Sequence, residues 1–528
     1  MSAPHASRRQ IARFAAIFAG GTLLSRVAGL LRDVVVLTSL PPAGRDAFLF
    51  AFRFPNLLRD MLGEGAVNAA FVPVFSECHE KKGEAAFREM VAACMSAMIL
   101  VFAVLTVAGV LLIPWVPSAM GLLQPLTGKP LPQNLDEVVR LTQWVFPYLF
   151  FIGMAVFAMA PLFTVKHYAT PSWSPVLLNI ALIVSCLTLR RFFEQPAWAL
   201  VVGVWAGGIL QLAIMFAAMK RHTGVLRPSF HLRHPGVGRA AWLLLPVILG
   251  QATGEVNKLV DSFFALSLHQ DRVTALYTAN RLIQLPLGVF GIAVSVAILP
   301  EISRAAARGE YKALRETLMH GLRQSFFLVA PAMVGLAVLR EPILRLLFAY
   351  RSFGPEALDF SSTALLIGVF GLVAFSGVKV CVQGFYAVQN TKTPVIVASV
   401  CMFINILLNA ALVGYLDYKG LMLGTVLSFT LNFAVLYALL CVHHGPLWDR
   451  SFLAALGKMV FAAAAMGALV YGALALLERL APTDAVWARG LKVVVPVGVG
   501  AAVYALVSRW LYVEELGQFV GALRRRKA

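Results

Sequence analysis

Charged side chains interrupt the first two long apolar stretches of the sequence. The first stretch contains Arg26, Arg32 and Asp33, and the second contains Asp46 and Arg59. An arginine at mid-bilayer costs about 2.5–3.5 kcal/mol on insertion scales, so in membrane-crossing stretches these residues must face a wet protein interior. Guanidinium groups bind phosphate through paired hydrogen bonds. An excess of arginine in such an interior therefore predicts an anion site, for phosphate in particular.

The spacing of these residues places several of them on one side of a helix. Ser25, Arg32 and Asp33 share a face at i, i+7 and i+8. Gly29 lies on the same face and permits a neighbouring helix or a ligand to approach closely. Arg281 lies well inside a later apolar stretch. The predicted substrate-binding residues are Ser25, Arg26, Arg32, Asp33, Asp46, Arg59 and Arg281.

Two other interpretations apply to any single arginine of this set. An arginine near the end of a span, such as Arg53 or Arg59, can extend to the membrane interface as an anchor. An arginine can also be neutralised by a neighbouring carboxylate, such as Asp33 or Asp46. The anion site therefore depends on several arginines acting together.

A second polar group comprises Asp261, Asn405, Asn409 and Thr425. A carboxylate, two carboxamides and a hydroxyl would form an all-oxygen site suited to Na⁺. The alternative is ordinary hydrogen bonding between helices, because Lys258 can pair with Glu255 or Asp261 and its ammonium can replace a metal ion. We favour this alternative. Sodium and the membrane potential are the two candidate driving forces, and no other cofactor is expected.

The elements that must position these residues are membrane-spanning helices. The chain has 528 residues, of which 59% are hydrophobic and 13% charged, and its mean hydropathy is +0.78. Its apolar stretches are long and continuous, which favours helices over the alternating strands of a barrel. At about 20 residues per crossing, the sequence predicts an all-α polytopic membrane protein of about 14 transmembrane helices.

The net charge of +19 has a topological explanation. Lysine and arginine concentrate in every second connection between the apolar stretches, and in the basic tail at residues 524–527. By the positive-inside rule, both termini are expected in the cytoplasm of a multi-pass protein. Nucleic acid is therefore not an expected partner, and the bilayer is.

An internal repeat divides the chain. Pro73 and Arg88 are matched by Pro300 and Arg315, with the same separation within each pair. A second match, Thr170-Pro171 with Thr393-Pro394, is separated by nearly the same length of chain as the first. An even number of helices per period predicts two six-helix lobes related by a pseudo-two-fold axis along the membrane normal. The expected parts are 1–235 (helices 1–6), 236–445 (helices 7–12) and 446–528 (helices 13–14 and the tail).

Motifs of enzymes are missing from the sequence. It has no Ser/His/Asp, GxSxG, P-loop or HExxH pattern in a usable context, and no aspartate-rich cluster for a Mg²⁺-dependent transferase. The six cysteines show no CxxC or Cys/His spacing. A transporter is therefore expected rather than an enzyme.

The first helix pair resembles a known family. The string Ser25-Arg26-Val-Ala-Gly-Leu-Leu-Arg32-Asp33, followed by Phe-Arg-Phe-Pro-Asn-Leu-Leu-Arg59, is similar to the MurJ (MviN) lipid II flippases of the multidrug/oligosaccharidyl-lipid/polysaccharide exporter superfamily. Asn-Arg281-Leu-Ile-Gln-Leu-Pro and Lys-Thr-Pro394 extend the match, which covers roughly residues 10–510.

The resemblance implies a function and a place. It implies a bacterial inner-membrane flippase that moves lipid II, an undecaprenyl-diphosphate-linked disaccharide-pentapeptide, from the cytoplasmic to the periplasmic leaflet for peptidoglycan synthesis. It implies alternating access through a central cavity with cations at Arg26, Arg32, Arg59 and Arg281 and carboxylates at Asp33 and Asp46. Contact with the cell-wall synthesis machinery is a further expectation. Gln284 departs from family members that carry a carboxylate there, and Lys258 puts a coupling-cation site in doubt.

Three alternatives remain at this point. The first is an ion-coupled exporter of another lipid-linked glycan or of drugs, whose cavity for cationic drugs should be acidic and aromatic. The second is a membrane enzyme acting on polyprenyl phosphate, which the missing acidic cluster disfavours. The third is a scaffold without transport activity.

Overall fold

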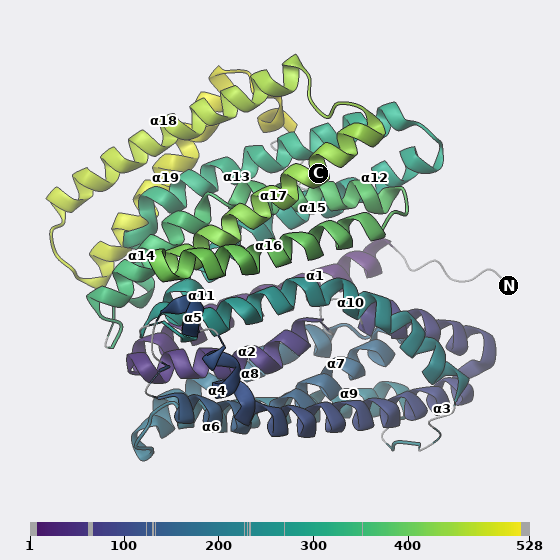
Figure 1. Ribbon diagram of the computed structural model, residues 1–528. Coiled ribbons are helices and arrows are strands. Elements are labelled where there is room, and N and C mark those ends of the chain that lie inside the picture. The colour runs from purple at the N-terminus through teal and green to yellow at the C-terminus, as the bar shows by residue number, and fades with distance from the viewer. Residues whose placement is uncertain are drawn as a thin grey trace. The chain divides into compact units, whose positions relative to one another are not determined.

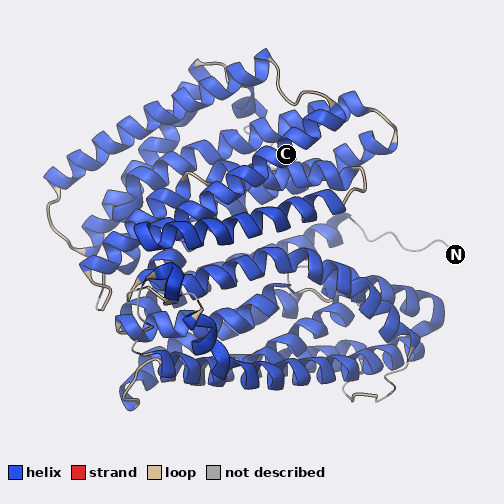
Figure 2. Ribbon diagram, in the orientation of Figure 1, coloured by secondary structure: helices blue, strands red, loops and turns tan. Residues whose placement is uncertain are grey.

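The computed structural model describes residues 8–61, 67–122, 124–128, 131–132, 134–225, 227–229, 231, 234–268, 270–350 and 352–518. Every regular element in these ranges is helical (Figure 2). Ten helical runs are long and apolar enough to cross a membrane, or up to 11 if the pair α14–α15, bent by 44°, counts as one span. The other apolar stretches of the sequence correspond to α1, α2 and α10. The all-α polytopic class is confirmed.

The chain forms two compact units, and the first holds residues 1–125, 129–270 and 350–353. Its helices are α1 (Arg8–Ser39), α2 (Pro42–Met61), α3 (Val67–Leu112), η2 (Ile113–Trp115), α4 (Val116–Gly121), α6 (Leu135–Val145), α7 (Tyr148–Thr164), α8 (Ala169–Leu189), η3 (Arg190–Phe192), α9 (Trp198–Thr223) and α10 (Pro235–Leu266). The short α5 (Gln124–Thr127) lies across the boundary between the units. Within this unit α8 packs against α1 and α9, and α3 packs against α7 and α10.

The second unit holds residues 126–128, 271–349 and 354–528. Its helices are α11 (Arg272–Pro286), the π-helical turn η4 (Leu287–Gly291), α12 (Ile292–Ala307), α13 (Tyr311–Phe348), α14 (Pro355–Val369), α15 (Leu372–Ala387), α16 (Lys392–Leu416), α17 (Tyr418–His444), α18 (Arg450–Leu480) and α19 (Val486–Trp510). Helices α18 and α19 pack against each other and against α13 (Figure 1).

The boundary between the units falls after Gln270, so α10 belongs to the first unit, where it packs on α2 and α3. The predicted parts 1–235, 236–445 and 446–528 follow the repeat in the sequence rather than packing. They remain a prediction.

The internal repeat is visible as the same local structure in each unit. After α7, Lys166 has φ 60 and His167 N–H donates to Leu162 O at 2.8 Å. After α15, Gln389 has φ 59 and Asn390 N–H donates to Phe385 O at 2.9 Å. Helices α7 and α15 therefore end with the same backbone conformation and the same hydrogen bond. The match of the Thr-Pro segments predicted this equivalence.

A threonine follows each of these helix ends, and it makes an equivalent side-chain contact in both units. His167 Nε2 lies 2.8 Å from Thr170 Oγ1, and Asn390 Nδ2 donates to Thr393 Oγ1 at 2.9 Å. The amide N–H of Thr393 donates to Asn390 Oδ1 at 3.1 Å, so the asparagine side chain bridges the turn. A histidine and an asparagine thus make the same connection in the two units.

Candidate anion site in the first unit

Arg32 and Asp33 form an ion pair inside the first unit. Arg32 donates from Nη2 to Asp33 Oδ1 at 2.6 Å and from Nε to the same oxygen at 3.0 Å. The Arg32 side chain is 13% exposed and that of Asp33 is 4% exposed. Both residues lie in α1, a helix that the sequence predicts to cross the membrane. Burial lowers the local dielectric, so the pairing is much stronger here than at a wet surface.

Asn179 of α8 completes this group. Its Oδ1 accepts from Arg32 Nη1 at 3.1 Å, and its Nδ2 donates to the backbone oxygen of Ser25 at 3.3 Å. Asn179 is 5% exposed. The guanidinium carbon of Arg32 also lies 6.0 Å from the ring centre of Phe52 in α2. One asparagine therefore connects Ser25 and Arg32, which the sequence placed on one face of α1.

Asn179 was not singled out from the sequence, although a signal was present. It is an amide in the middle of an apolar helix, and such residues form hydrogen bonds with neighbouring helices because lipid offers no partner. Only the fold shows that α1 is the helix beside it, since α1 and α8 pack closely.

Arg45 is a second residue that the sequence did not single out. It is 1% exposed and donates from Nη1 to the backbone oxygens of Leu37 and Ser352, each at 3.1 Å. Its guanidinium lies 4.9 Å from the centre of the Phe353 ring. Because the last carbonyl groups of a helix have no partner within the helix, Arg45 stabilises the end of α1. Its role is structural.

The remaining predicted residues are distributed as follows. Asp46 is 5% exposed in α2, Arg59 is half-buried near the end of α2, and Arg26 is exposed on α1. Arg281 is half-buried in α11, which belongs to the second unit. The structure thus brings together Ser25, Arg32 and Asp33. The joining of Arg281 to these residues remains a prediction.

The predicted sodium ligands divide between the units. Asp261 is in α10 of the first unit, whereas Asn405, Asn409 and Thr425 are in the second. Asn409 Nδ2 donates to Asn405 Oδ1 at 3.1 Å, and Thr425 Oγ1 donates to Leu421 O at 3.0 Å. The described residues contain no group of three or more His, Cys, Asp or Glu that could hold a metal ion.

Lys258 pairs with Glu255 one turn earlier in α10. The sequence predicted that Lys258 pairs with Glu255 or Asp261 if its ammonium takes the place of a metal ion. The pair with Glu255 is the first of these two. A sodium site at Asp261, Asn405, Asn409 and Thr425 stays a prediction.

Comparison with known proteins decides the family. The family model described as "Lipid II flippase MurJ" matches residues 43–488. The chain belongs to the lipid II flippase MurJ family. A probable lipid II flippase MurJ of Vibrio cholerae is 36% identical over 420 residues, which cover 79% of this chain and 80% of the relative. The lipid II flippase MurJ of Burkholderia cenocepacia is 32% identical over 459 residues, 85% of this chain and 88% of the relative.

Solved structures agree on the fold. A lipid II flippase MurJ in an inward closed conformation superposes with a TM-score of 0.75 at 24% identity, covering 94% of this chain and 99% of that one. An inward-facing multidrug resistance MATE family transporter of the MOP superfamily reaches 0.62 at 16% identity, covering 82% and 96%. The fold is therefore that of MurJ and of the wider superfamily.

Proposed function

We propose that this MurJ-family protein flips lipid II across the membrane and is a transporter rather than an enzyme. The observation that carries the proposal is the family match over residues 43–488, together with relatives that are 36% and 32% identical over most of their length. The buried ion pair of Arg32 and Asp33 agrees with it, because an intramembrane guanidinium suits the diphosphate of such a substrate.

The geometry around Arg32 gives this side chain a defined role. Asp33 and Asn179 hold the guanidinium beside α1 and α8. A diphosphate offers more acceptor oxygens and more charge than one carboxylate, so it competes for the same N–H groups. When the substrate leaves, Asp33 takes the guanidinium back. Asp33 is therefore a release group, and Arg26, Arg59 and Arg281 supply further positive charge during the transfer.

The proposed mechanism is alternating access, in which one protein opens first to the cytoplasmic leaflet and then to the periplasmic leaflet. The lobes bind the headgroup from the cytoplasmic side and then open to the periplasm, while the polyprenyl chain stays in lipid. An inside-negative potential favours outward movement of an anion by about 2.3 kcal/mol per charge per 100 mV. The membrane potential is thus the energy source that we favour, and sodium coupling is the other candidate.

The proposed place is the bacterial inner membrane, with both termini in the cytoplasm. The basic residues at the junction of α12 and α13, which include Arg304, Arg308 and Lys312, support this orientation by the positive-inside rule. Reporter fusions at the two termini and after α13 test it. A reporter active in the periplasm at either terminus contradicts the orientation. Since the product emerges at the outer leaflet, contact with the cell-wall synthesis machinery there is part of the proposal.

Lipid II exposure at the outer leaflet tests the function directly. Cells depleted of their own flippase and expressing this chain should expose lipid II at the normal rate. Arg32→Ala and Arg281→Ala should lower that rate at least about tenfold, since each removes a charge-assisted contact to phosphate. Arg88→Ala is the matched control, because Arg88 is an exposed arginine outside the predicted site. Normal export by both site variants would favour a scaffold or an exporter of another substrate.

A further inference from the structure

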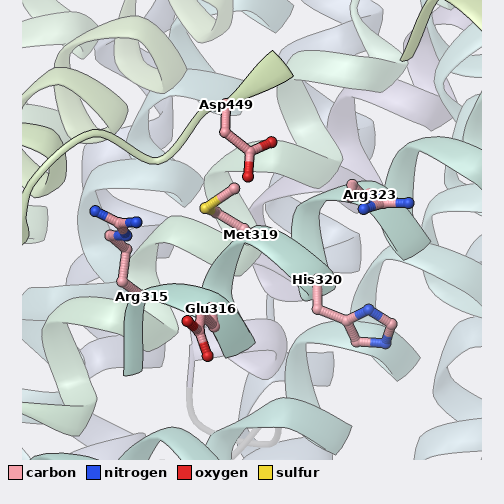
Figure 3. Close-up of a pocket in the computed structure, with 6 residues that line it drawn as sticks. All are labelled: Arg315, Glu316, Met319, His320, Arg323 and Asp449. Atoms are coloured by element: carbon pink, nitrogen blue, oxygen red, sulfur yellow. The ribbon is translucent and has the colours of Figure 1, made fainter. Parts of the chain in front are cut away.

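A small cavity lies in the second unit beside the start of α13. Its volume is about 210 Å³, and it is lined by Arg315, Glu316, Met319, His320, Arg323 and Asp449 (Figure 3). Five of these residues come from α13, and Asp449 comes from the connection between α17 and α18. Drug-sized ligand pockets are usually about 300–1,000 Å³, so this cavity suits a small polar group.

The repeat shows what is unusual about Arg315. Its counterpart in the first unit is Arg88, which pairs with Glu84 one turn earlier in α3. The residue one turn before Arg315 is Tyr311, whose ring stacks on His444 at 5.7 Å. Among the described residues Arg315 has no ion pair, and its buried Nε has no hydrogen-bond partner. The carboxylate that follows the glycine of the second unit, Glu310, instead lies 4.0 Å from Arg308 Nη1, so Arg315 has no ion pair among the described residues.

The space beside the arginine also differs between the units. In the first unit the connection after α9 closes over α3, where Ser229 N–H donates to Ala92 O at 3.2 Å and Ser96 Oγ donates to Ser229 O at 2.8 Å. The equivalents of Ala92 and Ser96 in the repeat are Met319 and Arg323, and both line the cavity. In the second unit Arg323 instead donates to Ser451 Oγ at 3.4 Å and pairs with Glu514 and Glu515, and the cavity lies beside these contacts.

The other charges of the cavity are partly engaged already. Arg323 pairs with Glu515 and Glu514, and Asp449 Oδ1 accepts from Phe452 N at 2.6 Å as the N-cap of α18. Glu316 is exposed. A simple anion would gain from Arg315 but would meet the carboxylates of Glu316 and Asp449. A simple cation would meet Arg315. A ligand with both charges avoids either conflict.

The surroundings place the cavity at a membrane interface. Trp448, next to Asp449, is 54% exposed, and Leu453 in the first turn of α18 is 52% exposed. Tryptophan gathers at the boundary between lipid headgroups and acyl chains. Farther along α18, Val460 and Phe461 are also exposed and offer an apolar surface for acyl chains. Basic pockets at this level bind lipid headgroups.

We propose that this cavity binds a zwitterionic phosphoethanolamine group, with the phosphate on Arg315 and the ammonium between Asp449 and Glu316. In the view of Figure 3, His320 and Arg323 lie on the side of the cavity away from Arg315. The group can belong to a membrane phospholipid or to a soluble phosphoethanolamine, since both present the same phosphate and ammonium. The site is separate from Arg32 and Asp33, which lie in the other unit, and it does not depend on the proposed lipid II transport.

Native mass spectrometry of the full-length protein tests the proposal. Phosphatidylethanolamine should bind about tenfold more tightly than phosphatidylglycerol, which lacks the ammonium, or phosphatidylcholine, whose ammonium has no N–H, all with identical acyl chains. Arg315→Gln should remove this preference. Arg88→Gln is the matched control and should keep it, because Arg88 has its own carboxylate. Equal binding of the three lipids together with no binding of free phosphoethanolamine, or an equal loss in both variants, overturns the proposal.

A second variant separates binding from folding. Asparagine caps helices as well as aspartate does, so Asp449→Asn should keep α18 intact and remove one partner of the ammonium. It should bring the affinities for phosphatidylethanolamine and phosphatidylglycerol closer together, and an unchanged difference contradicts the assignment. Competition with free phosphoethanolamine identifies the source. Displacement of the lipid shows that the headgroup alone is recognised, whereas binding of the free compound without any lipid preference supports a soluble ligand.

Discussion

Each unit contains an arginine that follows a glycine turn and lies against the glycine that ends another helix. We call this arrangement the corner of the unit, and its other side chains differ between the two units. In the first, Arg88 follows Gly83 (φ 81) and lies against Gly224, which ends α9 with φ 71. In the second, Arg315 follows Gly309 and lies against Gly445 after α17. The arginine and the two glycines with positive φ are present in both units. The partners of the two arginines and the covering segments differ, so a duplicated scaffold can carry different chemistry at equivalent positions.

The largest expected difference between the corners concerns Arg323 and its counterpart Ser96. Glu515 is 1% exposed and accepts from Arg323 Nε at 2.5 Å. Arg323→Ala leaves this carboxylate buried without its partner, which should cost about 3–5 kcal/mol. Ser96→Ala removes one neutral hydrogen bond, worth about 1 kcal/mol. The thermal midpoints of the purified variants measure the two effects.

A double variant separates the lost ion pair from the lost packing. Arg323→Met combined with Glu515→Leu should recover most of the stability, because no charge is then buried alone. Equal losses in Arg323→Ala and Ser96→Ala would mean that the C-terminal segment is not held by this pair. The contrast between the two corners would then be smaller than the contacts indicate.

The next prediction compares the two glycines that end α9 and α17. Gly445 has φ 85 and ψ 172, a region that is essentially closed to other residues, so Gly445→Ala should cost about 1–3 kcal/mol. Gly224 has φ 71 and ψ 0, where Gly224→Ala costs about 1 kcal/mol and displaces only the flexible end of Arg88. A larger loss of thermal midpoint at Gly224 would show that the space around Arg88, not the backbone, limits substitution.

The repeat and the helices of both corners could be predicted from the sequence. Long apolar stretches indicate helices because every backbone polar group must be satisfied inside the bilayer. The matched Pro-to-Arg and Thr-Pro segments also indicated that the two halves share a fold, and the equivalent helix ends at Lys166 and Gln389 confirm this. The domain boundary could not be read in this way, because the packing of α10 on α2 and α3 leaves no local pattern in the sequence.

The candidate site was predictable in part, for a physical reason. Arg32 and Asp33 stand out because charge is expensive in an apolar helix. Asn179 and Arg45 became visible only when the fold placed α8 and Ser352 beside α1. The cavity at Arg315 also needed the structure, since the sequence matches Gly83-Glu84 and Arg88 with Gly309-Glu310 and Arg315, and only the contacts show that Glu310 lies near Arg308. Side-chain pairs between distant segments follow from packing rather than from periodicity.

A pH-dependent difference is expected between His167 and its counterpart Asn390. Burial lowers the pKa of His167, and the positive charges of His222 and Arg221 lower it further. The folded protein therefore binds this proton less readily than the unfolded chain, whose histidines titrate near pH 6.5. Stability that is present above that pH should fall as the pH drops through about 6.5 toward the lowered pKa.

The variant His167→Asn copies the second unit and removes this titration. Its thermal midpoint should change less than that of the wild type between about pH 7 and about pH 5. Asn390→His is the converse test and should add a similar dependence where the second unit has none at this turn. If the wild type and His167→Asn respond alike to acid, the stacked His167 and His222 pair, with ring centres 4.0 Å apart, does not contribute to acid sensitivity.

The smallest effect is expected at the two arginines themselves, and its sign distinguishes the corners. The side chains of Arg88 and Glu84 are 50% and 63% exposed, so Arg88→Gln should cost about 0.3–0.5 kcal/mol, and less at high salt because exposed pairs are screened. Arg315→Gln removes a cation that has no ion pair among the described residues, so without ligand it should leave the thermal midpoint unchanged or raise it. Adding phosphatidylethanolamine should then stabilise the wild type and Arg88→Gln but not Arg315→Gln, because a ligand stabilises only the protein that binds it. Stabilisation of all three to the same degree would show that the lipid acts on the protein elsewhere.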